Sequence, residues 1–138
     1  MISQTVFRLN ISQKVGLGHF KRLLILKKKL DIKPLWILSG DKEIIQKLFK
    51  NKNFIYFSNY KNEVKYIPTL KQKGFKKVVF DIANSLYVKN NKNLKLIKAY
   101  KKNKLKTVSF DIPYQRSVSD ISILPYDFKR KKNNNIKN

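Results

Sequence analysis

Short apolar stretches alternate along this chain with longer segments in which apolar residues recur at helical spacing. Residues 5–10 alternate between apolar and polar positions and include β-branched and aromatic side chains, which predicts a first strand. Similar short stretches predict further strands at residues 35–38, 54–57, 78–82, 108–112 and 120–124.

Between these stretches, apolar residues three and four positions apart predict amphipathic helices. We expect helices over residues 19–30, from 41 to about 50, and over 94–102. Asp41 has the side chain of a good N-cap for the second of them. The stretch from about 62 to 73 is expected to be helical in its later part, with Pro68 at or near a helix start.

Strands that alternate with helices of about ten residues predict a parallel sheet with right-handed crossovers. A repeat supports this spacing, because Val-Val-Phe-Asp-Ile at residues 78–82 recurs as Val-Ser-Phe-Asp-Ile at 108–112. We therefore expect an α/β fold, Rossmann-like, with a parallel sheet flanked by helices. One domain should cover residues 1–128, followed by a disordered tail rich in Lys and Asn at 129–138.

The charge is extreme for 138 residues: 32 Lys and Arg against 8 Asp and Glu give a net charge of +24. Such a balance suggests a polyanion-binding module. However, only four of the cations are arginine, and the abundance of Lys, Asn and Ile also fits a genome rich in adenine and thymine. We expect compositional bias with a solvated surface, and any nucleic-acid binding to be non-specific.

Composition also excludes several kinds of site. The chain has no cysteine and a single histidine, His19, so disulfides, thiolate metal sites, a cysteine nucleophile and multi-histidine metal sites are excluded. No apolar run approaches the roughly 18 residues of a membrane span. The first residues lack the layout of a secretory signal. We expect a cytoplasmic protein that uses no metal and no cofactor and does not act at a membrane.

Candidate chemistry gathers after the predicted strands. Parallel sheets bind ligands beyond the carboxyl ends of their strands, where Gly16 to His19, Asp81 and Asp111 all fall. Gly16 and Gly18 would let a ligand approach the backbone at a helix N-terminus that favours phosphate. His19 could accept a proton from water, and Arg22 lies on the same helical face. Both aspartates could equally be caps that follow buried strands.

The segment that starts at Arg8 resembles the N-terminal motif of the pseudaminic-acid pathway UDP-sugar hydrolases and the related spore-coat polysaccharide proteins. Their pattern is Arg-x-Asp-x-Ser, then Ile-Gly-x-Gly-His-x-x-Arg-x-Leu-x-Leu. This chain matches it without a gap at the following positions: Arg8, Ser12, Gly16, Gly18, His19, Arg22, Leu24 and Leu26. The sequence departs from the family at Asn10, where the family has Asp, at Lys27, and in the residues after Asp81.

The resemblance implies a first domain like the N-terminal half of a GT-B glycosyltransferase, and hydrolysis of a UDP-linked acetamido sugar to UDP and free sugar. His19 would be the general base. Substrate-binding residues would be those at the strand ends and in the glycine turn: Arg8 near the site entrance, Asn10, Ser12, Gly16, Gly18, Arg22 and Asp81. Family members also have a second domain that supplies most uridine and diphosphate contacts, so this chain would need such a domain or a partner chain.

Three alternatives stay open from the sequence. The same fold could serve a glycosyltransferase, which would transfer the sugar to an acceptor instead of water. The charge could serve a non-catalytic, basic polyanion-binding module. The chain could also be a folded fragment with no activity of its own.

Overall fold

A computed structural model describes residues 4–13, 17–82, 91–110 and 118–123 of the chain. Within them, a six-stranded sheet runs in the order β3-β2-β1-β4-β5-β6, and every neighbouring pair of strands is parallel. The prediction of a Rossmann-like α/β fold is confirmed. The strands are β1 (Thr5–Ile11), β2 (Leu35–Gly40), β3 (Phe54–Tyr56), β4 (Lys77–Asp81), β5 (Lys106–Phe110) and β6 (Ile121–Ile123).

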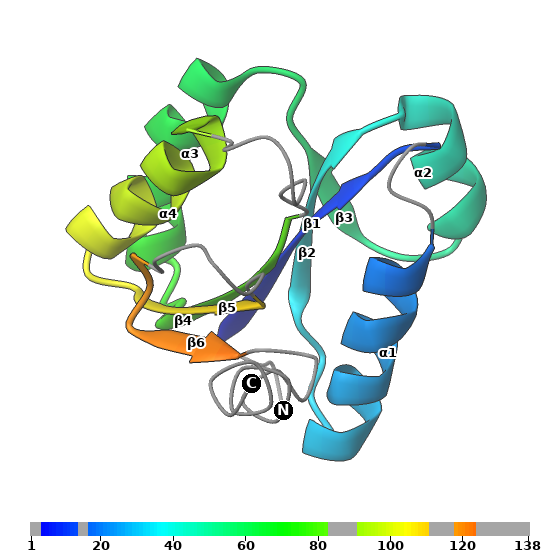
Figure 1. The fold of residues 1–138 in the computed structure, drawn as a ribbon, viewed down its shortest axis with the longest axis horizontal. Coiled ribbons are helices and arrows are strands. Elements are labelled where there is room, and N and C mark those ends of the chain that lie inside the picture. Colours follow the sequence, from blue (N-terminus) through cyan, green and yellow to red (C-terminus); the bar gives the residue numbers. More distant parts are fainter. Residues whose placement is uncertain (1–3, 14–16, 83–90, 111–117, 124–138) are drawn as a thin grey trace, which may run out of the picture.

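In the described part of the chain, four helices cover the two faces of the sheet and lie on either side of it in Figure 1. They are α1 (Gly18–Leu30), α2 (Lys42–Leu48), α3 (Tyr60–Gln72) and α4 (Asn91–Lys102). Among the residues described, none of these helices combines the length and the apolar character that a membrane span requires. The tail at 129–138 and Asp111 lie outside the described residues.

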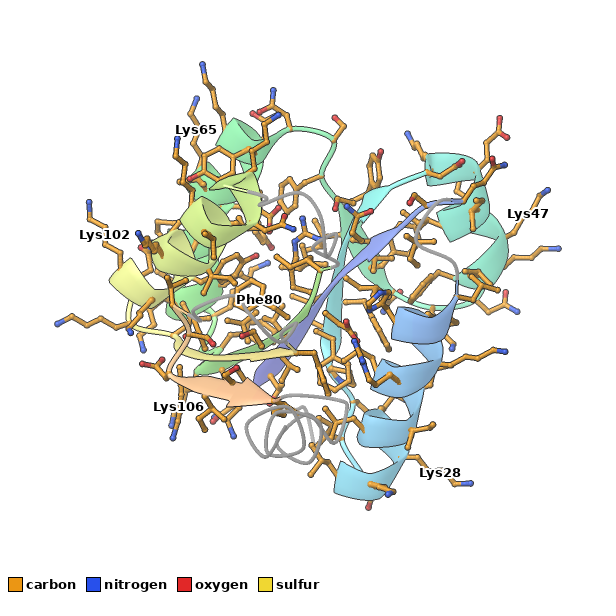
Figure 2. The ribbon with its side chains drawn as sticks, viewed as in Figure 1. Lys28, Lys47, Lys65, Phe80, Lys102 and Lys106 are labelled. Carbon is orange, nitrogen blue, oxygen red and sulfur yellow. The ribbon has the colours of Figure 1, made fainter. Side chains whose placement is uncertain are left out.

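The core consists of two clusters, one on each face of the sheet, because side chains alternate along buried strands. Phe7, Leu9 and Trp36 pack under α1 and α2, whereas Val6 and Phe80 pack under α3 and α4. Phe80 lies near the centre of the molecule in Figure 2, while the labelled lysines project from its periphery. This alternation also decides the face on which each polar strand residue lies.

Local capping explains where α2 and α3 begin. The Asp41 carboxylate accepts hydrogen bonds from the amides of residues 43 and 44, so the predicted N-cap is confirmed. Asn59 caps α3 in the same way by accepting from the Lys61 amide. The expectation that a helix starts at Pro68 is wrong, because this capped helix begins at Tyr60 and contains Pro68 on its exposed side.

The strand order creates a topological switch point between β1 and β4. The chain runs outward from β1 through β2 to β3, then returns to place β4 on the other side of β1. Sheets of this kind bind ligands in the crevice beyond the carboxyl ends of the strands at that point. The residues that follow β1 and those that end β4 therefore occupy the position where a site is expected.

Candidate active site

His19, Arg22 and Asp81 meet at the switch point. His19 and Arg22 lie in the first two turns of α1, which follows β1, and Asp81 is the last residue of β4. In the sheet Asp81 is the neighbour of Leu9, on the face that α1 covers. Residues about 60 positions apart in the sequence are thus brought into contact, as the convergence of strand ends predicts.

The Asp81 carboxylate is the centre of this cluster. Its Oδ2 accepts from Arg22 Nε at 2.7 Å, and its Oδ1 accepts from Arg22 Nη2 at 2.5 Å. The same Oδ1 lies 2.5 Å from His19 Nδ1. The side chain of Asp81 is 1% exposed, whereas His19 and Arg22 are 26% and 27% exposed. The carboxylate is therefore enclosed, and the imidazole remains accessible to a small molecule.

Two contacts of His19 Nδ1 bear on which ring nitrogen carries the proton. Arg22 Nη2, which can only donate, lies 3.0 Å from Nδ1, but the contact with the Asp81 carboxylate is the shorter of the two at 2.5 Å. An ionised carboxylate can only accept hydrogen bonds, so the contact between Asp81 and Nδ1 needs a hydrogen on Nδ1. In the neutral ring, Nε2 is then left without a proton and can act as an acceptor. A carboxylate that orients an imidazole through Nδ1 is a recurrent arrangement for general bases.

Arg22 has two further contacts besides its bidentate pair with Asp81, and the first is the approach of its Nη2 to His19 Nδ1 at 3.0 Å. The carbon of its guanidinium lies 4.4 Å from the centroid of the Phe110 ring, in a cation–π arrangement. The register of β4 and β5 pairs Phe80 with Ser109, so the next residues along the two strands are Asp81 and Phe110. The sequence repeat would instead align Asp81 with Asp111. Arg22 therefore spans two strand ends, and its contacts are with the protein.

The structure places Arg8 away from this cluster, which corrects the expectation that it lies near the site entrance. Arg8 is buried on the opposite face of the sheet, where its Nε and Nη2 donate to the two carboxylate oxygens of Glu63 at 2.7 and 2.9 Å. The Tyr100 hydroxyl donates to the same carboxylate at 2.8 Å. Side-chain alternation is the reason, because Arg8 has the parity of Val6 and not that of Phe7 and Leu9.

Burial raises the pKa of the Tyr100 phenol well above its ordinary value, and the neighbouring Glu63 carboxylate raises it further. The phenol therefore stays protonated and keeps donating to Glu63. Glu63, which sequence reasoning missed, balances the Arg8 guanidinium. These three residues form a buried polar network that joins β1, α3 and α4.

The other predicted binding residues lie along the carboxyl edge of β1. Asn10 is half-buried, and its buried Oδ1 has no hydrogen-bond partner in the described part of the chain. A carboxylate at this position would bury an unpaired charge. The neutral amide of Asn10 therefore fits this environment better than the Asp of the resembled family would. Ser12 is half-buried directly after β1.

Of the two glycines predicted to shape the turn, the structure describes only Gly18. Gly16 lies outside the described residues. Gly18 is exposed at the start of α1, and nothing in the described part of the chain lies within 4 Å of where a Cβ would stand. The space beside Gly18 is therefore open. The Leu17 side chain makes no capping hydrogen bond to the amides of this first turn.

Neither comparison with known proteins adds an identification. No family model matches the chain, and no curated protein matches it. Among the described residues, no three His, Asp or Glu side chains come together as they do around a metal ion. The features that define the site are therefore the contacts of His19, Asp81 and Arg22 and the sequence motif that contains His19 and Arg22.

Proposed function

We propose that this chain is the N-terminal domain of a nucleotide-sugar hydrolase of surface polysaccharide or nonulosonic acid biosynthesis, with His19 as the general base. The observation that carries the proposal is the contact of His19 Nδ1 with the enclosed Asp81 carboxylate. The glycine-histidine-arginine motif of the resembled hydrolases supplies the substrate class, a UDP-linked acetamido sugar. The second half of the site would come from a further domain or a partner chain.

In this proposal each residue has a distinct role. His19 Nε2 takes a proton from water as the water oxygen bonds to the reacting centre, and the bond to UDP breaks with its electrons on the departing group. Asp81 and Arg22 are positioning residues, because the carboxylate is enclosed and both of its oxygens are already occupied. The uncapped amides of the first turn of α1 would lie near the diphosphate.

The assay that tests the proposal measures UDP release from UDP-linked acetamido sugars. It uses the protein isolated from its native cells, so that any second domain or partner chain is present. We expect His19→Ala to lower the rate by about 10²-fold or more, as the loss of a general base does. The matched control is Lys21→Ala, an exposed change on the same helix that should leave the rate unchanged.

The outcomes separate the candidate functions. Full hydrolysis by His19→Ala, or no UDP release by the native protein, would contradict the proposal. Sugar transfer to an added acceptor in preference to water would favour a glycosyltransferase of the same fold.

A further inference from the structure

From Lys92 onward, the described side chains of α4 and of the start of β5 have lysine at every exposed position. Between residues 92 and 106 all seven exposed residues are lysine, and we call them the α4 lysine face: Lys92, Lys95, Lys98, Lys101, Lys102, Lys104 and Lys106. Elsewhere the surface is mixed. Lysine fills four of the eight exposed positions between residues 42 and 53, and four of the nine between 17 and 33. If lysine were spread evenly over the surface, the three segments would have similar fractions of lysine at their exposed positions, and they do not.

In the described part of the chain, little negative charge compensates the α4 lysine face. Glu63 of the neighbouring α3 is buried and already paired with Arg8. Asp120 lies 3.5 Å from Lys101, as measured between its Oδ1 and the lysine Nζ. The pKa of Asp120 is lowered, and the hydrogen bonds from Thr107 are the main cause. The Asp120 carboxylate therefore interacts mainly with β5 and less with Lys101. Among the described residues, the other lysines of the face are exposed and form no ion pair.

The lysine face continues around one end of the sheet. In the register of β4 and β5, Lys77 is the neighbour of Lys106, and the Lys71 side chain reaches the carbonyl of Lys104. A hollow of ≈ 430 Å³ lies beside the end of α4 and is lined by Lys101, Lys104, Leu105, Lys106 and Asp120. The positive surface therefore extends beyond α4 and includes a hollow.

We propose that the α4 lysine face binds the phosphate backbone of a nucleic acid without reading its sequence. Lys92 and Lys102 are ten residues apart on one helix, about 15 Å along its axis. That length matches about four phosphates of one duplex strand, at about 3.4 Å each. Cations that neutralise phosphates gain affinity by releasing counterions.

Two features of this face argue against a lipid surface as its partner and against base-specific recognition. The exposed positions between residues 92 and 106 include no apolar side chain, so this face has no anchor for a lipid bilayer. They also include no arginine, the side chain that reads guanine by paired hydrogen bonds. A phosphate backbone is the partner that a purely lysine face fits.

This binding would be independent of the proposed hydrolysis. The α4 lysine face lies on the opposite side of the sheet from α1, which carries His19, as Figures 1 and 2 show. Changes on α4 can therefore be made without contact with the His19–Asp81 pair.

The test measures fluorescence anisotropy of labelled duplex DNA and of single-stranded RNA, each about 20 nucleotides long, over a series of salt concentrations. The test variant carries K92Q, K95Q, K98Q and K102Q. The control carries K28Q, K29Q, K47Q and K50Q, which remove the same charge from exposed positions in α1, in α2 and just after α2, the helices that cover the other face of the sheet. We expect the α4 variant to bind about tenfold or more weakly at 100 mM salt, with a salt slope reduced by about 2 to 4.

The control should weaken binding by less than about threefold. Equal losses in the two variants would overturn the proposal, because net charge alone would then explain the affinity. Absence of binding by the native chain at low salt, or binding to phosphatidylserine vesicles with none to nucleic acid, would also overturn it. If the fourfold variant does not fold, the pair K98Q and K102Q, against K28Q and K47Q, gives the same comparison.

Discussion

At the scale of single residues, two buried carboxylates determine how this chain uses its polar side chains. Asp81 gathers His19 and Arg22 on one face of the sheet, and Glu63 gathers Arg8 and Tyr100 on the other. Both carboxylates are almost fully enclosed, so each depends on its cationic partner. One cluster leaves a side chain accessible to solvent and the other does not.

Replacing Glu63 with Gln should destabilise the fold strongly, because the Arg8 guanidinium would stay buried without a counter-charge. We expect a loss of about 3 to 5 kcal/mol in the free energy of unfolding. Urea denaturation measures it, with Glu43→Gln as the control at an exposed position, where about 0.5 kcal/mol or less is expected. Equal stability of the two variants would show that the buried pair of Arg8 and Glu63 does not contribute this much to the free energy of unfolding.

Tyr100 should make the stability of the fold decrease at high pH. Its pKa is raised on folding, so folding favours the protonated phenol; the contribution is complete below the unfolded value near 10 and is lost as pH rises through the folded value. The stability advantage of the native chain over Tyr100→Phe should therefore shrink between about pH 9 and about pH 11. Urea midpoints of both proteins across that range measure it. An advantage that grows with pH would contradict the assigned environment.

At the scale of elements, the turn from β2 to α2 depends on one glycine. Gly40 has φ +111°, and a Cβ there would lie 2.1 Å from the Ile11 carbonyl oxygen. Gly74 has φ +93° with nothing within 4 Å. We expect Gly74→Ala to cost about 1 to 2 kcal/mol from backbone strain alone, and Gly40→Ala to cost clearly more. Thermal unfolding of both variants measures the difference, and a milder effect at Gly40 would contradict the close packing of β1 and β2.

The elements themselves were largely predictable, because short alternating stretches and helical spacing are local signals. The order of the strands was not, since periodicity does not say which strands are neighbours. Asp81 illustrates the consequence: its place at a strand end was predictable, but its pairing with Arg22 depends on β4 lying beside β1. The sequence repeat would have matched Asp81 with Asp111, whereas the register sets Phe110 beside it.

Arg8 shows how far the environment of a side chain can be predicted from the sequence. Its alternation with Phe7 and Leu9 could have revealed that it lies on the other face of the sheet. Alternation along the strand does not identify the partner of Arg8. Glu63 is 55 positions away, in a helix whose sequence is rich in polar residues and gives no sign that this carboxylate is buried. A charged residue in the middle of an otherwise apolar strand is a signal that a buried counter-charge exists somewhere in the chain.

At the scale of the whole molecule, the net charge of +24 should make stability depend on salt. Repulsion among the lysines opposes the compact state and is screened as ionic strength rises. We expect the melting temperature to rise between about 10 mM and about 500 mM sodium chloride, because the Debye length falls from about 30 Å to below 10 Å. Differential scanning calorimetry measures it, and a constant or falling melting temperature would show that the charges do not oppose folding.

A role for His19 as general base requires that Asp81 hold the ring with its proton on Nδ1. Two-bond ¹H–¹⁵N correlation spectra of the imidazole report the tautomer directly, and the assignment is unambiguous because the chain has a single histidine. The neutral ring should carry its proton on Nδ1 in the native chain and lose this preference in Asp81→Asn. A neutral ring protonated on Nε2 in the native chain would contradict the account, because that nitrogen could not then accept a proton from water.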